Sequence, residues 1–331
     1  MMQHPAILAL LTSSFIISLM MLYAGWNGIQ ILEKWDLTSG SELQLTLERR
    51  TYLISTILSY ALVFQILSLF LYIYTADEIH GLFTGAMCAA GTLNVNSDGY
   101  PTLILKIVNC ILAGVWLIVN YADTRGYDYP LIKVKYGLLT VLAPLVLLET
   151  LSQYGFFSQL RADVITSCCG SLFSVEKPGM AGDIAALPFG VMEPVFFAAM
   201  AATTVCGIVF YRKGRGGYLF SAMSSATFLI AASSLISFIC LFFYELPTHH
   251  CPFCILQKDY DYVGYLLYVT LLGGVVTGLG TGVLFAVRKR SSMALVVPAL
   301  LRRLTAATLT CYLLFTAIVV IRMLTTSFRL G

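Results

Sequence analysis

Two histidines and two cysteines lie within six residues of one another in the last third of the chain. The segment reads His249-His250-Cys251-Pro252-Phe253-Cys254-Ile255-Leu256-Gln257-Lys258. In a Cys-x-x-Cys turn the first thiol is drawn toward its thiolate form by its partner, and nearby cationic side chains add to this effect. A thiolate is both the nucleophile of disulfide exchange and a soft metal ligand. The segment therefore indicates redox or metal chemistry at Cys251 and Cys254, or else a static structural disulfide.

The composition places this segment in a membrane protein. The chain has 331 residues, of which 58% are hydrophobic and 11% are charged, whereas soluble proteins carry about 25% charged residues. Eight apolar runs are long enough to cross a hydrocarbon core of about 30 Å as helices. These runs cover residues 5–28, 52–75, 101–122, 132–155, 186–211, 218–245, 262–287 and 304–325. We therefore expect an all-α, polytopic bundle of about eight transmembrane helices, forming a single integral membrane domain over residues 1–331 that contacts membrane lipid. The net charge of +3 gives no reason to expect a nucleic-acid partner.

The distribution of basic residues predicts the orientation of the spans. Fourteen of the 20 Lys and Arg residues fall in the segments 33–51, 123–136, 212–217 and 288–303. Because cytoplasmic loops carry an excess of Lys and Arg, we expect these segments on the cytoplasmic side of the inner membrane. Both termini and three loops then face the non-cytoplasmic side. These loops cover residues 76–100, 156–185 and 246–261. The polar segment 33–50 is also compatible with a short interfacial helix.

This topology collects further candidate thiols on the outer side. Cys88 lies in the first outer loop, and the adjacent Cys168 and Cys169 lie in the second. We regard these three as candidate redox-active residues beside Cys251 and Cys254. The remaining cysteines fall inside predicted spans, where a thiol usually behaves as a small hydrophobic group. They are Cys110, Cys206, Cys240 and Cys311.

The histidines allow a different chemistry at the same place. None of the four lies inside a predicted span, which argues against a b-type haem held between two helices. Sulfur and imidazole ligands gathered in outer loops would suit a soft metal ion such as copper(I) or mercury(II). The candidate ligands are His80, Met87, Cys88, His250, Cys251 and Cys254.

The cysteine motif also resembles a known family. The residues Cys251-Pro252-Phe253-Cys254-Ile255-Leu256-Gln257-Lys258 resemble the Cys-x-x-Cys-Ile-x-Gln/Glu-Arg segment of the bacterial quinone-linked disulfide-bond-formation membrane proteins, with Lys258 in place of the arginine. The order of parts over residues 132–287 is similar to that of the vitamin K epoxide reductases. In both, a span is followed by an outer loop with cysteines, two more spans, and a Cys-x-x-Cys motif that opens the last. The resemblance implies a four-helix redox bundle over residues 132–287.

The resemblance further implies an electron relay. Cys168 or Cys169 would exchange disulfides with a thioredoxin-like or other redox protein on the outer face, and the electrons would pass through Cys251 and Cys254 to a membrane quinone. The residues implied to lie beside the quinone are Phe253, Gln257 and Lys258. Two alternatives remain. The protein could bind or transport a soft metal ion, or it could anchor further membrane subunits of a larger redox complex, with purely structural disulfides.

Charged residues also fall in the outer parts of predicted spans, at Lys106, Glu149 and Glu193. Each costs about 2.5–3.5 kcal/mol on insertion scales. Each therefore needs a partner, a water-filled cavity or a place close to the head-group layer. Because all three lie toward the outer ends of their spans, Glu149 and Glu193 are candidates to line a quinone cavity and to carry protons there.

The seventh span carries three glycines at four-residue spacing. Gly274, Gly278 and Gly282 share one face of the predicted helix. Such a face lets another helix approach closely. We therefore expect tight helix packing there, with a cofactor lying in the groove as the alternative.

Overall fold

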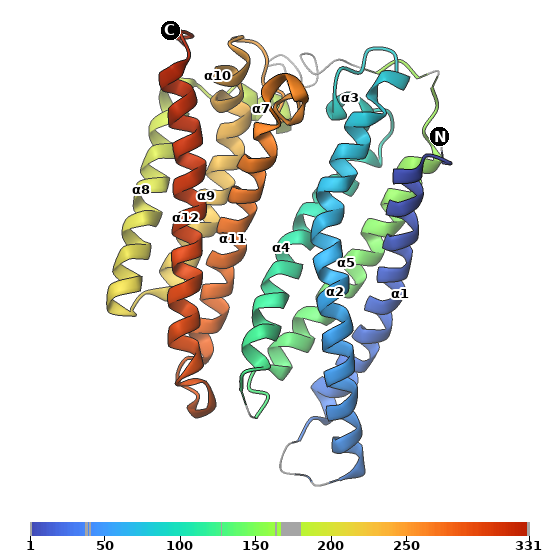
Figure 1. Cartoon of the computed structure of the whole chain (residues 1–331), viewed down its shortest axis with the longest axis vertical. Helices are drawn as coiled ribbons and strands as arrows, with labels where there is room; N and C mark the ends of the chain where they lie inside the picture. Colours follow the sequence, from blue (N-terminus) through green and yellow to red (C-terminus); the bar gives the residue numbers. More distant parts are fainter. Residues whose placement is uncertain are drawn as a thin grey trace. The chain divides into compact units, whose positions relative to one another are not determined.

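The structure is a computed structural model that describes residues 2–36, 39, 41–126, 128–162, 164–166 and 180–329. This part of the chain consists of helices, loops and one isolated β-bridge (Figure 1). Eight of its helices are long and apolar enough to cross a membrane, which confirms the number read from the apolar runs. The protein is therefore an all-α integral membrane protein. Cys168 and Cys169 lie outside the described residues.

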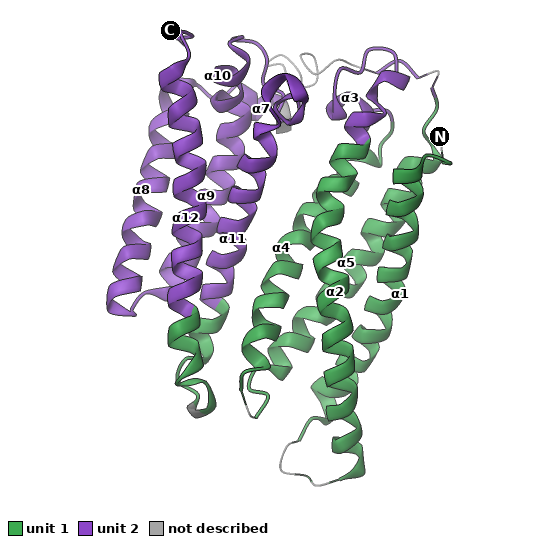
Figure 2. Cartoon of the chain, in the orientation of Figure 1, with its two compact units in different colours: residues 1–75, 96–161, 283–300 green, residues 76–95, 162–282, 301–331 purple. Residues whose placement is uncertain are grey.

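The chain divides into two compact units, drawn in green and purple in Figure 2. Unit 1 comprises residues 1–75, 96–161 and 283–300, and unit 2 comprises residues 76–95, 162–282 and 301–331. Within the described residues each unit is built on four long helices. The bundle expected over residues 132–287 takes its first helix from unit 1 and the other three from unit 2, and it stays a prediction.

Unit 1 contains four long helices, two of which pack closely through glycines. They are α1 (Pro5–Lys34), α2 (Glu42–Glu78, of which the last three residues belong to unit 2), α4 (Gly99–Asp123) and α5 (Ile132–Ser158). The helix α5 packs against both α1 and α4. A Cβ atom added at Gly25 of α1 would lie 3.2 Å from Ala143 Cβ of α5, and one added at Gly28 would lie 3.1 Å from Tyr136 Cδ1. A larger residue at either glycine would therefore require the neighbouring side chain on α5 to move.

The described residues of the polar segment 33–50 do not form a separate interfacial helix. The helix α1 continues to Lys34, and α2 begins at Glu42 and runs without a break into the apolar span. The side chain of Leu47 is buried in the core of unit 1. Gln44 Nε2 donates a hydrogen bond to Glu48 Oε1, one helical turn further on, at 2.9 Å. The helix α2 therefore begins ten residues before the predicted apolar span at residue 52. Polar residues can form this first part because a helix depends on local propensity and side-chain pairs as well as on apolar sequence.

Unit 2 contains the other four spans, except for residues 283–287 and 296–300 at the ends of two of them, which belong to unit 1. These are α8 (Phe189–Lys213), α9 (Gly217–Ser234) continued by α10 (Cys240–Tyr244), α11 (Val263–Val287) and α12 (Val296–Thr325). A π-helical turn, η2 (Leu235–Ile239), joins α9 to α10 within a single span. Two short helices, α3 (Ala89–Leu93) and α7 (Met180–Ala185), lie outside the spans.

The glycine face of α11 packs tightly, as expected. A Cβ atom added at Gly278 would lie 2.1 Å from Ser224 Oγ of α9, and one added at Gly274 would lie 2.7 Å from Tyr312 Cε1 of α12. Tyr312 also donates a hydrogen bond to the carbonyl oxygen of Ser224 at 2.7 Å. The face is therefore occupied by two neighbouring helices, which confirms the packing interpretation.

The C-terminal part of α12 fixes the end of α10. Arg322 donates from Nε to the carbonyl oxygen of Phe242 at 3.0 Å and from Nη2 to that of Phe243 at 3.1 Å. These carbonyl groups belong to the last turn of α10, which has no further helical residues to bond them. Arg322 also forms an ion pair with Glu245 at 3.1 Å. Arg322 therefore anchors the residues from which the loop with the cysteine motif begins.

Candidate thiol site

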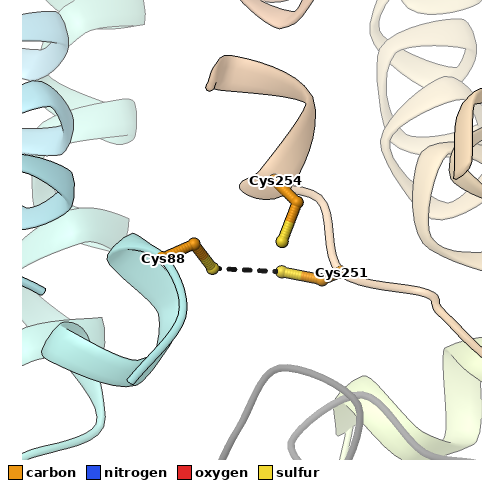
Figure 3. Close-up of side chains that lie close together, drawn as sticks. All are labelled: Cys88, Cys251 and Cys254. Atoms are coloured by element: carbon orange, nitrogen blue, oxygen red, sulfur yellow. Dashed lines mark hydrogen bonds between the residues drawn. The ribbon is translucent and has the colours of Figure 1, made fainter. Parts of the chain in front are cut away.

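Three cysteines of unit 2 lie together, and their side chains converge (Figure 3). The sulfur atoms of Cys88 and Cys251 are 3.7 Å apart, and those of Cys88, Cys251 and Cys254 all lie within 4.8 Å of one another. A disulfide bond is about 2.05 Å long, so these atoms are close without being covalently joined. All three residues are buried, with Cys254 at 6% exposure and the others at 0%. The separation of 163 residues between Cys88 and Cys251 means that the fold alone brings them together.

A tight loop between α2 and α4 holds Cys88. Cys88 directly precedes α3, and its carbonyl oxygen accepts a hydrogen bond from the backbone N–H of Gly91 at 3.0 Å. Gly85 has a φ of +90°, and a Cβ atom there would lie 2.4 Å from the carbonyl oxygen of Thr166. A Cβ atom at Gly91 would lie 2.7 Å from the Cα atom of Ala86. Glycine is therefore required at Gly91, where the loop folds back on itself, and at Gly85, where it packs against the backbone of Thr166.

Two tyrosines from outside the motif fix the Cys-x-x-Cys turn. The hydroxyl group of Tyr244, at the end of α10, donates to the carbonyl oxygen of Cys251. The hydroxyl group of Tyr268, on α11, donates to the carbonyl oxygen of Pro252. Within the turn, the backbone N–H of Phe253 points at the sulfur of Cys251 at 3.5 Å. A donated N–H favours the thiolate form of that sulfur.

Gln257 joins the two segments that carry the thiols. Its Nε2 atom donates to Asp77 Oδ1 at 3.1 Å and to the carbonyl oxygen of Met87 at 3.0 Å. Asp77 Oδ1 also accepts a hydrogen bond from the backbone N–H of Ala89 at 3.0 Å. Met87 and Ala89 flank Cys88, and Gln257 lies three residues after Cys254. This clamp therefore holds both sides of the thiol site in register.

Replacing Gln257 by leucine should make the disulfide between Cys88 and Cys251 harder to form. Two hydrogen bonds between the segments are lost, each contributing about 0.5–1.5 kcal/mol, so we expect the equilibrium constant to fall about 10-fold. The measurement is the fraction of this disulfide in glutathione redox buffers, determined by mass spectrometry. Lys258→Leu is the matched control, because Lys258 is the exposed neighbour of Gln257. Equal effects of the two substitutions would contradict the clamp.

His249 directly contacts the thiol of Cys254. Its Nε2 atom lies 3.4 Å from the sulfur of Cys254, and its ring packs edge-on against Tyr244 with the centroids 4.6 Å apart. The ring of Tyr260 also packs edge-on against Tyr244, with the ring centroids 4.9 Å apart. Partial burial raises the pKa of Tyr260, and negative charge on Cys254 and Asp259 raises it further. The phenol of Tyr260 therefore stays protonated at neutral pH.

Two further histidines, His250 and His80, contact backbone carbonyl groups. His250 Nδ1 lies 2.8 Å from the carbonyl oxygen of Ile236, in the π-helical turn. Because a carbonyl group can only accept, this nitrogen carries a proton. His80 Nδ1 pairs with the carbonyl oxygen of Asp77. Among the described residues, the group of possible metal ligands contains the three cysteines and neither of these histidines.

The residues implied to lie beside a quinone differ in exposure. Phe253 is buried, Gln257 is half-buried with its amide nitrogen used in the clamp, and Lys258 is exposed. Glu193 is half-buried on α8. Their contact with a quinone stays a prediction.

No protein-family model, curated protein or solved structure matches the chain. The function of the thiol site therefore has to be inferred from its geometry.

Glu149 lies in unit 1, within a buried polar network. Lys106 Nζ contacts its Oε1 atom at 2.7 Å, and the amide groups of Gln65 and Asn109 each donate to its Oε2 atom at 2.6 Å. Lys106 also donates to Ser68 Oγ at 3.2 Å. The side chains of the ion pair are 0% and 1% exposed. The charges of Lys106 and Glu149 thus neutralise each other, while a proton-carrying role for Glu149 stays a prediction.

The sequence did not single out the residues that hold the thiol site in place. Asp77, Tyr244 and Tyr268 each contribute a hydrogen bond that positions one of the cysteine segments. Asp77 and Tyr244 are polar residues at the ends of spans, and this position was the only feature of the sequence that could have identified them. Tyr268 lies inside a predicted span, and no feature of the sequence distinguished it.

Proposed function

We propose that the protein is a membrane thiol–disulfide oxidoreductase that passes electrons from a thioredoxin-like protein to a membrane quinone. The observation that carries this proposal is the separation of 3.7 Å between the sulfur atoms of Cys88 and Cys251, with Cys254 in the same group. A disulfide between two of these residues can be attacked by the third without a large movement of either segment. Three converging thiols therefore support exchange better than a single static bridge.

The exchange within the site conserves electrons. When Cys88 and Cys251 are joined, the Cys254 thiolate attacks the sulfur of Cys251, the new disulfide forms, and Cys88 leaves as a thiolate. His249, in contact with Cys254, stabilises the attacking thiolate when its imidazole is protonated. The disulfide moves from one pair to the other without any gain or loss of electrons.

The net reaction requires two external reactants. A dithiol on the thioredoxin-like partner reduces the disulfide through a mixed disulfide, which leaves the partner oxidised and two thiols in the site. Those thiols then give two electrons and two protons to the quinone, which becomes a quinol, and the disulfide reforms. Cys168 and Cys169 remain proposed entry points for the partner.

The proposed location follows from the basic residues and from the chemistry. With the Lys- and Arg-rich segments in the cytoplasm, the thiol site and both termini face the non-cytoplasmic side of the inner membrane. Disulfides persist on that side because it is oxidising. A relay that ends in a membrane quinone would keep them reoxidised.

The test is differential alkylation of the cysteines in native membranes, followed by mass spectrometry. We expect a disulfide among Cys88, Cys251 and Cys254 whose fraction rises when quinone is added and falls when reduced thioredoxin is added. Cys240, buried in α10, should stay a thiol throughout. Thiols that remain reduced under excess quinone would refute the relay. A disulfide that resists both reagents would leave only a structural role, as in an anchor subunit.

A further inference from the structure

The spacing of the three sulfur atoms also matches a metal-binding set. A thiolate lies about 2.3 Å from a bound d10 metal ion, so three thiolates around one ion lie about 4 Å from one another. The sulfur atoms of Cys88, Cys251 and Cys254 are all within 4.8 Å of one another, with the first pair at 3.7 Å. An ion placed among them would therefore need only small side-chain movements.

The donor set consists of sulfur. The two histidines expected from the sequence as ligands, His80 and His250, use Nδ1 for backbone carbonyl groups, and neither contributes an atom to the group within the described residues. A third histidine, His249, lies beside the group, with Nε2 3.4 Å from the sulfur of Cys254, but it is not one of the ligands that converge. A set of three soft thiolate ligands favours copper(I). A structural zinc ion would take four protein ligands. The sequence predicted a set of histidine and sulfur ligands, whereas the structure brings together three cysteine sulfur atoms. This ligand set fits copper(I) better than structural zinc.

The site is organised before any metal arrives. The thiol segments are held by the Gln257 clamp and by the two tyrosine hydroxyl groups on the Cys-x-x-Cys turn. All three cysteines are buried, which removes competition from water. We infer that the reduced thiol site is a three-thiolate binding site for copper(I), formed by Cys88, Cys251 and Cys254.

This site has a consequence for regulation, which rests on the proposed redox function. A thiolate bound to copper(I) is no longer available to attack a disulfide or to form one. Copper(I) would therefore hold the protein in its reduced state and stop the relay. Metal binding itself needs neither the quinone nor the partner.

The experiment uses the purified full-length chain, reduced with a phosphine in detergent, without quinone or partner protein. Copper(I) is supplied from its complex with bathocuproine disulfonate, and binding is followed by loss of the colour of that complex. We expect one tightly bound copper(I) ion per chain. X-ray absorption of the copper-loaded protein should show three sulfur neighbours. This spectrum requires no substitution, so it tests the site even where a variant misfolds.

Serine substitutions test each ligand. Cys88→Ser, Cys251→Ser and Cys254→Ser should each weaken copper(I) binding about 100-fold or more, since the loss of a supporting partner alone weakens metal sites about 10–100-fold. Cys240→Ser is the matched control, a buried cysteine of unit 2 outside the group. Four sulfur neighbours, a histidine nitrogen bound to copper, or unchanged binding in Cys88→Ser would overturn the inference. Because quinone and partner are absent, failure here leaves the redox proposal standing, and failure of the redox test leaves this one standing.

Discussion

Cys251→Ser is expected to lower quinone-dependent oxidation of a thioredoxin-like dithiol by about 1,000-fold or more. The sulfur of Cys251 is common to both disulfides of the proposed exchange, one with Cys88 at 3.7 Å and one with Cys254 in the same group. A serine hydroxyl is not ionised at neutral pH and forms no disulfide, so both routes close together. The measurement is quinol formation in membranes supplied with reduced thioredoxin and a soluble quinone.

The other two cysteines should behave differently. Cys254→Ser leaves Cys88 and Cys251 able to form a disulfide but removes the thiol that exchanges with it, so a mixed disulfide with the partner should accumulate and appear on non-reducing gels. Cys240→Ser should keep full activity, because this thiol lies in α10 outside the group. Activity above about a tenth of wild type in Cys251→Ser would refute the relay through this residue.

The number of spans and the tight packing of the glycine face could be predicted better than the thiol site. The number of spans follows from local composition, because a helix must cross the hydrocarbon core on its own residues. The tight packing of Gly278 against Ser224 also followed from local spacing. Each of these features depends on residues within a few turns of one another.

The membership of the thiol site depended on contacts between distant segments. From the sequence, Cys88 was a candidate redox partner of the motif, and His80 and His250 were candidate partners under the alternative of a metal site, since all were expected on the same side. The fold selects Cys88 and directs both histidines to carbonyl groups of their surroundings. That choice depends on the Gln257 clamp, which joins residues 180 positions apart. No periodicity or local motif contains this information.

The sequence could predict that the intramembrane charges need compensation, but not which residue compensates which. The cost of burying Lys106 and Glu149 indicated that each needed a partner, a cavity or the head-group layer. It did not indicate that they would find each other across two helices, with Gln65 supplying an additional hydrogen bond to the carboxylate. Of these three possibilities, the structure shows that Lys106 and Glu149 are each other's partner.

Lys106→Met is expected to lower the free energy of unfolding by about 3–5 kcal/mol, because it leaves the carboxylate of Glu149 buried without a counter-charge. Glu149 is 1% exposed, so water cannot take the place of the ammonium group. The measurement is reversible denaturation of the purified protein in mixed micelles. Glu245→Gln is the matched control. It breaks the ion pair with Arg322, whose side chains are 33% and 46% exposed, and it should cost less than about 1 kcal/mol.

The double substitution Lys106→Met with Glu149→Gln distinguishes charge pairing from packing. It removes both charges while the new amide keeps hydrogen-bonding capacity toward Asn109 and Gln65, so stability should return to within about 1 kcal/mol of wild type. If the losses from the two single substitutions simply add, the ion pair contributes nothing and the helices are held by shape alone. If the double variant recovers, the cost in Lys106→Met comes from an uncompensated charge. The pair then acts as a requirement for joining α4 to α5, because either residue without the other is more costly than neither.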